Sequence, residues 1–223
     1  MKKIFLDIET LPASDAVWKQ LPPKVRDDLA AKFRKTGTPK QKMDEAYRRT
    51  SLIGDLGRIL CIGLLVEDEQ QGSPVVLGWD EAAGRFREDE PALLRELWDA
   101  LRDFEAHRDL LIGHNVLEFD LRFIHQRSVV HRVKPSVELS LRRYSSQPVF
   151  DTMQEWSKWS RQERVSLDRI ALALGLASSK TEEISGATVY DRYLEGQHRL
   201  IREYCAADVV LTRAVYRRMT FAD

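Results

Sequence analysis

Two acidic residues interrupt the apolar run with which this chain begins, and they restrict what it can fold into. The run from Lys3 to Ile8 is typical of a buried strand, yet Asp7 and Glu9 stand at its end. Residues two apart on a strand project to the same side. Burying unpaired carboxylates is costly or shifts their pKa, and a cation removes that penalty. The alternative is a polar strand edge with ordinary surface acids.

Three further residues extend this pattern along the chain. Asp120 ends the segment Gly-His-Asn-Val-Leu-Glu-Phe-Asp, and Tyr204 and Asp208 stand four residues apart in a strongly helical C-terminal stretch. That spacing places the phenol and the carboxylate on one helix face. Grouped carboxylates suit hard cations such as Mg²⁺ or Mn²⁺, and two such ions side by side cleave phosphodiesters. The sequence therefore predicts that the four acids converge on one site.

Composition and charge leave the class of partner open. The formal net charge of the 223 residues is zero, so any surface that attracts nucleic acid must be local. The two cysteines, Cys61 and Cys205, are expected to be reduced thiols in or near the core, in preference to a disulfide or a metal site. The N-terminus has neither a signal peptide nor a membrane span, so we expect a cytoplasmic protein without a membrane partner.

The hydrophobic pattern predicts an α/β fold with a mixed sheet flanked by helices. Its expected strands and helices are bounded by glycine, proline and acidic residues. The predicted strands cover Lys3 to Ile8, Arg58 to Val66, Pro74 to Trp79, Leu110 to Gly113 and Val149 to Asp151. The predicted helices cover Pro91 to His107, Phe119 to Val130, Leu167 to Leu176 and Leu200 to Met219.

The segment from Leu11 to Gly57 does not belong to that alternation, and we expect a helical insertion with a mobile middle near Thr36. Between Lys32 and Arg49 it carries seven basic residues against two acidic ones, a local charge of about +5. A second basic stretch runs from Arg122 to Arg143. Solvated faces explain both stretches about as well as a groove for a single-stranded backbone.

Three blocks of the sequence resemble the motifs of the DEDD (DnaQ-like) 3′-5′ exonuclease superfamily, which has a ribonuclease H-like fold. The segments are Asp7-Ile8-Glu9-Thr10, Asn115-Val116-Leu117-Glu118-Phe119-Asp120 and Tyr204-Cys205-Ala206-Ala207-Asp208. Tyrosine four residues before the last aspartate is similar to the tyrosine branch of that superfamily. Gly113-His114-Asn115 and the length look most like the predicted exonucleases related to the proofreading domain of family B DNA polymerases. We therefore expect a single exonuclease domain over residues 1–223.

The resemblance implies roles for individual residues. Asp7 would bridge two Mg²⁺ or Mn²⁺ ions, Glu9 and Asp208 would complete the tighter site, and Asp120 would hold the second ion. Tyr204 would orient the attacking water, because a phenol is a poor general base at neutral pH; a core tyrosine is the alternative. Catalysis would remove nucleoside monophosphates from the 3′ ends of single-stranded DNA or RNA, with DNA favoured.

Other residues near the motifs are expected to contact the substrate. By resemblance these are Thr10, His114, Asn115 and Phe119, with Asn115 hydrogen bonding and Phe119 packing against terminal nucleotides. Asp151 is either an acid near the site or a plain helix cap. Two alternative functions remain open: a non-catalytic nucleic-acid binding module on the same fold, and an endonuclease or phosphodiesterase that uses the same metal pair.

Overall fold

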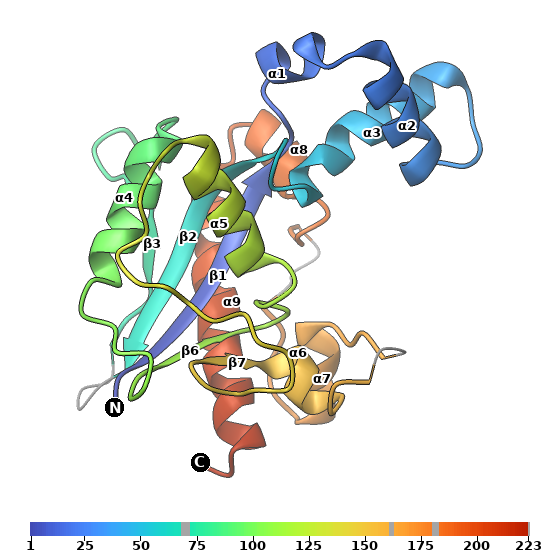
Figure 1. Ribbon diagram of the computed structural model, residues 1–223. Coiled ribbons are helices and arrows are strands. Elements are labelled where there is room, and N and C mark those ends of the chain that lie inside the picture. Colours follow the sequence, from blue (N-terminus) through green and yellow to red (C-terminus); the bar gives the residue numbers. More distant parts are fainter. Residues whose placement is uncertain (68–71, 161–162, 180–182, 223) are drawn as a thin grey trace.

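A mixed five-stranded sheet organises the protein, as the sequence predicts (Figure 1). The computed structural model describes residues 1–67, 72–160, 163–179 and 183–222. The strand order is β3-β2-β1-β6-β7, with β2 antiparallel to both β1 and β3 and with β6 parallel to both β1 and β7. The strands are β1 (Lys3–Leu11), β2 (Arg58–Glu67), β3 (Val75–Leu77), β6 (Leu110–Gly113) and β7 (Val149–Asp151).

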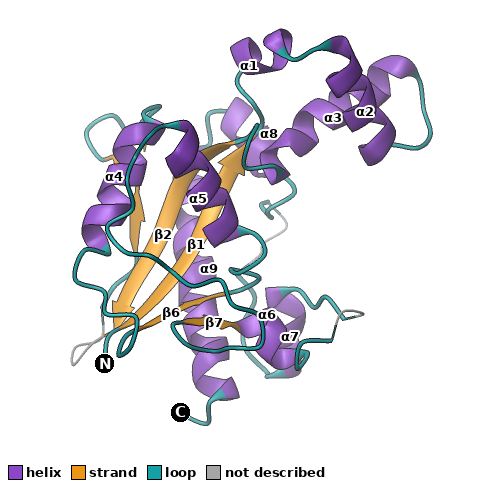
Figure 2. Ribbon diagram, viewed as in Figure 1, coloured by secondary structure: helices purple, strands orange, loops and turns teal. Residues whose placement is uncertain are grey.

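Helices cover both faces of the sheet, and the alternation along β1 explains which residues each helix contacts. Ile4, Leu6 and Ile8 pack into the main core with α4 (Glu90–Ala100) and α5 (Asp120–Val130). Phe5 points to the opposite face, where it packs with Val209 of the long helix α9 (His198–Met219). Figures 1 and 2 show β1 between these two helical layers. Asp7 and Glu9, in phase with Phe5, therefore face α9.

The third predicted strand is shorter than expected, because Gly78 has a positive φ of 86° and turns the chain. β3 ends at Leu77, and Trp79 instead starts a two-stranded ribbon that the sequence did not predict, made of β4 (Trp79–Asp80) and β5 (Arg85–Phe86). The predicted helix from Pro91 to His107 is also shorter, since α4 ends at Ala100, although Leu101 and Phe104 remain buried.

The insertion between β1 and β2 consists of helices that stand beyond one end of the sheet (Figure 1). Pro22 and Pro23 divide its first half into α1 (Asp15–Gln20) and α2 (Pro23–Phe33). The breaker-rich middle is a helix start: Thr38 and Gln41 form a capping box for α3 (Pro39–Arg49), which a short 3₁₀ turn, η1 (Thr50–Leu52), follows. The segment in which a mobile middle is expected therefore contains a capped helix start.

Smaller helices complete the fold: α6 (Thr152–Trp156), α7 (Leu167–Ala173) and α8 (Val189–Leu194). The sequence did not predict α8, which has six residues and no side-chain cap. Helix α7 ends close to its predicted limit, where Gly175 takes a positive φ of 70°. Within the described ranges, none of the helices combines the length and the apolar character needed to cross a bilayer.

A buried ion pair ties α4 to α5 and corrects one prediction. Arg127 lies in the second basic stretch, but it is buried and donates two hydrogen bonds to the Glu90 carboxylate, at 2.9 and 2.7 Å. Glu90 also accepts from the backbone N–H of Ile59 at 2.7 Å. Arg127 is therefore part of the framework and is unavailable to a bound strand.

Candidate active site

The first strand supplies two acids to the face covered by α9. Asp7 is partly exposed, and Glu9 is buried with 5% of its surface exposed. A β-bulge interrupts the β1–β2 register at this point: Glu9 pairs with Cys61, whereas Thr10 pairs with Ile59. The extra residue, Leu60, packs on the same side as Cys61. Bulges re-aim side chains next to active sites, and this one lies where the acidic segment ends.

Helix α9 contributes Tyr204 and Asp208, which lie one helical turn apart and are both buried. The helix approaches the sheet closely because β2 has Gly63 opposite Asp7. A Cβ atom at Gly63 would come within 2.6 Å of Val209 Cγ2 and 3.0 Å of Cys205 Sγ. The absence of a side chain at this position therefore permits the approach of α9 to the acids of β1.

Asp120 reaches the same site around the edge of the sheet. Strand β6 pairs only with Lys3 to Phe5 of β1, so the later part of that β1 edge is open to other partners. Asp120, the first residue of α5, accepts a hydrogen bond there from the backbone N–H of Ile8 at 3.1 Å. This contact places the acid of the second motif beside the first motif, although 112 residues separate the partners.

Electrostatic coupling shows that all four acids share one site. Burial, followed by the charges of Asp120 and Asp208, raises the pKa of Asp7 well above its ordinary value. Burial and then the charge of Asp7 do the same to the pKa of Glu9. Burial also raises the pKa of Asp120 to about 7, although the hydrogen bond from Ile8 lowers it. Such mutual repulsion is the signature of a site that gains from a cation.

Tyr204 lies at the edge of this cluster. Burial, the charges of Glu9 and Asp208, and the hydrogen bond that its hydroxyl donates to Asp208 together raise the pKa of Tyr204 far above its usual range. The phenol therefore stays protonated at neutral pH and cannot act as a base. The side chain contributes a fixed O–H group directed at one of the acids.

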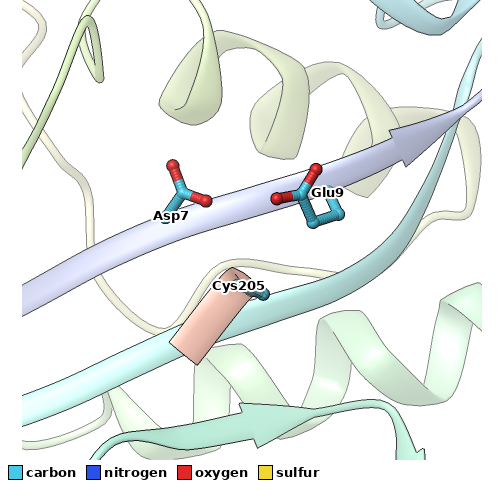
Figure 3. Close-up of side chains that lie close together, drawn as sticks. All are labelled: Asp7, Glu9 and Cys205. Carbon is cyan, nitrogen blue, oxygen red and sulfur yellow. The ribbon is translucent and has the colours of Figure 1, made fainter. Parts of the chain in front are cut away.

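One neighbour of the acids was expected only as a core thiol. Cys61 and Cys205 are both buried and free. Cys205 also lies beside the acids, because its Sγ and one carboxylate oxygen each from Asp7 and Glu9 all fall within 4.8 Å of one another (Figure 3). Nothing in the sequence marked it except its position next to Tyr204.

The donor set fits Mg²⁺ or Mn²⁺. A hydrogen bond with Cys61 and burial raise the pKa of the Cys205 thiol, so it stays protonated and is a weak ligand. The carboxylate oxygens of Asp7, Glu9, Asp120 and Asp208 remain as the strong ligands, and oxygen donors are those that hard divalent cations prefer.

Asp151 is a structural clamp for the loop of the second motif. Its carboxylate caps α6 by accepting hydrogen bonds from the backbone N–H groups of Met153 and Gln154. It also accepts from the N–H groups of Asn115 and Leu117, at 3.0 and 3.1 Å. The capping role left open by the sequence is therefore observed, together with a second role in holding the segment that leads to Asp120.

The residues expected to contact the substrate lie in different environments. His114 Nδ1 lies 3.0 Å from Thr152 Oγ1. Asn115 has a positive φ of 58°, and its Oδ1 is buried without a hydrogen-bond partner in the described part of the chain. Phe119 packs against Phe123, with ring centroids 5.6 Å apart. A bound ligand that donates a hydrogen bond would satisfy the buried Asn115 Oδ1.

A cavity of about 250 Å³ opens beside Glu9 and Thr10 and reaches the insertion. Thr10 Oγ1 donates to the Ser51 carbonyl at 2.7 Å, which fixes η1 against the end of β1. The opposite wall includes Gly186, where an added Cβ would lie 3.9 Å from the Tyr204 hydroxyl. The insertion and the segment before α8 therefore enclose space next to the acids. Its other lining residues are Glu45, Arg48, Arg49, Leu52, Ala187 and Tyr190.

Comparison with solved structures supports the fold. The chain is similar to the family B DNA polymerase from the hyperthermophilic archaeon Pyrobaculum calidifontis, with a TM-score of 0.63 and 16% sequence identity. The match covers 99% of this chain and 24% of the polymerase, so the chain spans about a quarter of that protein's length. At this identity the likeness concerns the fold, and it confirms the expected ribonuclease H-like architecture. No curated protein matches the chain.

A family model matches residues 52–223, which include Asp120, Tyr204 and Asp208. Its description is "Predicted 3'-5' exonuclease related to the exonuclease domain of PolB". Asp7, Glu9 and most of the insertion precede the matched range, and the structure brings the two acids to the matched ones. The chain belongs to this family of predicted 3′-5′ exonucleases related to the exonuclease domain of PolB.

Proposed function

We propose that this protein is a single-domain, metal-dependent 3′-5′ exonuclease that removes nucleoside monophosphates from the 3′ end of single-stranded nucleic acid, with DNA favoured. The observation that carries the proposal is the convergence of four carboxylates from β1, α5 and α9 on one site. The family match supports the reaction class. A binding module has no need of four mutually repelling acids held at such electrostatic cost.

The acids divide into two groups by position. Asp7, Glu9 and Asp208 lie between β1 and α9 and would hold one Mg²⁺ or Mn²⁺ ion, while Asp120, at the sheet edge, would hold a second with Asp7. When bound, the two ions would supply the Lewis acidity that promotes phosphodiester hydrolysis. Tyr204, whose hydroxyl is fixed against Asp208, would orient the water nucleophile. The hydroxyl cannot take the proton, since its pKa is raised.

The substrate would enter through the groups around the acids. We assign Thr10, His114, Asn115 and Phe119 to the terminal nucleotides, with the unsatisfied Asn115 Oδ1 as an acceptor for a substrate donor. The insertion adds Arg48 and Arg49, which line the cavity next to Glu9. Both are held in exposed ion pairs, Arg48 with Asp191 at 2.7 Å and Arg49 with Glu45 at 2.6 Å. Such pairs are weak and can exchange for a phosphate.

A degradation ladder tests the proposal. Single-stranded DNA and RNA labelled at the 5′ end are incubated with the protein and Mg²⁺ or Mn²⁺, beside duplex controls. Stepwise shortening is expected, and Asp7→Asn should abolish it while near-native circular dichroism shows that the fold persists. Internal cuts would support the endonuclease alternative. Binding without any shortening, in wild-type protein with either ion, would support the non-catalytic module and refute the proposal.

A further inference from the structure

A second cavity, of about 310 Å³, lies beside Glu118 of the second motif. We call it the aromatic cavity. It is formed where the loop before β7 meets the segment after α6, and of the lining residues named below Glu118 alone belongs to a motif of the family resemblance. The lining residues used below are Glu118, Arg143, Tyr144, Gln154, Trp159, Glu163 and Arg164.

Two aromatic rings form one wall of the aromatic cavity. The ring centroids of Tyr144 and Trp159 lie 5.1 Å apart, with 45° between their planes. Tyr144 has 67% of its surface exposed, which is unusual for a large aromatic side chain that packs against another. Trp159 is anchored, since it packs at the edge of the main core and its Nε1 donates to Glu155 Oε1 at 3.3 Å. One ring is thus fixed while the other presents a free face.

Backbone conformation holds both rings in place at an energetic cost. Tyr144 has a φ of 62° and Trp159 a φ of 63°, in the left-handed region that bulky residues rarely adopt, and Lys158 shares it with a φ of 48°. Strain of this kind persists where the surrounding structure fixes it, and it concentrates at binding sites. Two strained aromatic residues from different segments meet in one cavity, which favours a role in binding.

The second motif and the hydrogen bonds of Asp151 connect the aromatic cavity to the active site. Glu118 stands two residues before Asp120 in the second motif. On the opposite side, the N–H of Gln154 donates to Asp151, the residue that also clamps Asn115 and Leu117. The two walls are therefore joined through Asp151 and the second motif to the segment that carries Asp120.

The charges of the lining are balanced, which restricts the ligand. Arg143 and Arg164 are offset by Glu118 and Glu163, and Arg143 Nη2 donates to Glu118 Oε1 at 2.9 Å. A site for phosphate alone would show an excess of cations. Flat aromatic faces with both donors and acceptors nearby suit a heteroaromatic ring that carries both kinds of group, and a nucleobase is such a ring.

We propose that the aromatic cavity is a nucleobase subsite, which stacks one base of the single strand on Tyr144 away from the scissile end. The identity of the polymer rests on the proposed exonuclease function, whereas base binding itself does not require catalysis. Stacking on Tyr144 tolerates any base, so the subsite would give affinity for unpaired strands without reading their sequence. A paired base cannot offer its face, and duplex would be excluded.

Fluorescence anisotropy on the inactive Asp7→Asn protein in EDTA tests this inference. The ligands are a labelled single strand, the same strand with abasic sites throughout, and a duplex. In this background Tyr144→Ala should weaken binding of the normal single strand about tenfold, the loss of one base–aromatic stack. Phe221→Ala, which removes an aromatic side chain that is 95% exposed, is the matched control and should leave affinity unchanged.

The abasic strand separates stacking from contact with the backbone. It should bind weakly, and Tyr144→Ala should not weaken it further, whereas Trp159→Phe should retain binding of the normal strand. Equal affinity of the Tyr144→Ala and parent proteins for the normal strand would overturn the subsite, and so would an equal loss on the abasic strand. If the degradation ladder fails but the Tyr144-dependent preference for the normal strand remains, the proposed exonuclease function is wrong and the nucleobase subsite stands.

Discussion

At the scale of single residues, Tyr204 shows how a side chain can be important to a reaction without changing its own protonation. Its hydroxyl donates to Asp208 and its pKa is raised by burial and neighbouring acids. In the proposed reaction it acts by orientation, which stabilises the transition state more than the bound substrate.

Tyr204→Phe should therefore lower kcat by about 100-fold, the effect of removing one positioned donor, with little change in KM. The variant keeps the ring and its packing, so the melting temperature should stay near that of the wild type. Steady-state kinetics on a labelled oligonucleotide measure both constants. A Tyr204→Phe protein with wild-type kcat would show that the residue only packs.

Residues that belong to a recognisable motif could be predicted from the sequence. Residues whose role depends on hydrogen bonds to a distant backbone segment, or on close packing, could not. Asp7 and Glu9 stood out because acids are costly in an apolar strand, and Asp120 and Asp208 stood out through their places in the other two motifs. The four backbone hydrogen bonds accepted by Asp151 had no such signal, since they depend on where β7 brings the residue. Cys205 was equally hidden, because its proximity to Asp7 follows from how closely α9 packs.

At the scale of elements, the close approach of α9 to β2 is the feature on which the site depends. Gly63→Ala would place a Cβ 2.6 Å from Val209 Cγ2 and 3.1 Å from the carbonyl oxygen of Cys205. The helix must then move away from the sheet, at a cost of about 1–3 kcal/mol of unfolding free energy. Asp208 would move away from Asp7 with it.

We expect Gly63→Ala to weaken Mg²⁺ or Mn²⁺ binding, measured by calorimetry, as well as to lower stability. Adding Val209→Ala removes the closest contact and should restore part of the metal affinity, although that change alone creates a cavity. A Gly63→Ala protein with wild-type metal affinity would indicate that the acids do not depend on the position of α9.

The basic residues of the insertion differ in how close they lie to the acids. Of its basic residues, Arg48 and Arg49 line the cavity beside Glu9, whereas Lys32 lies over the ring of Phe33, 5.1 Å from its centroid, within α2. The double change Arg48→Glu, Arg49→Glu should raise KM for long single strands about tenfold at low salt and reduce the salt dependence of binding. The matched double change Lys32→Glu, Lys35→Glu alters the net charge equally. If both pairs raise KM alike, the insertion acts through general charge and not through the cavity.

Helices and strands could be predicted where one hydrophobic pattern continued along the whole element. Strand β1 and helix α9 follow their predicted positions within a few residues, because β1 begins with a continuous apolar run and the buried residues of α9 keep helical spacing. The ribbon of β4 and β5 and the helix α8 are too short to show a period. The start of α3 at Pro39 escaped prediction because glycine and proline occur in turns and at capped helix starts alike.

At the scale of the whole molecule, the acidic site links the stability of the fold to metal and pH. The acids come from residues near both ends of the chain and from its middle, so global unfolding separates them. Sequence could predict that they meet, but the depth of their burial, which sets their pKa values, depends on the complete fold. The raised pKa values of Asp7, Glu9 and Asp120 mean that the metal-free native state holds protons that the unfolded chain has released.

The raised pKa values determine whether the free energy of unfolding rises or falls with pH. Unfolded carboxyl groups titrate near pH 4, whereas Asp120 titrates at about 7 in the native state. Between these values the native state binds more protons, so the free energy of unfolding of the metal-free protein should fall as pH rises. His198 acts in the opposite direction, because burial lowers its pKa. Glu90, with a lowered pKa, adds stability that is lost only in acid.

Comparison with the double variant Asp7→Asn, Asp120→Asn isolates the acids from these other groups. In EDTA the wild type should lose stability between about pH 5 and pH 7 relative to the variant, as measured by urea unfolding at each pH. At pH 7, Mg²⁺ at 100 times its dissociation constant should stabilise the wild type by about 2.7 kcal/mol and leave the variant nearly unchanged. Parallel pH profiles in EDTA, with an equal response to Mg²⁺, would mean that the acids neither repel one another in the fold nor hold the ions.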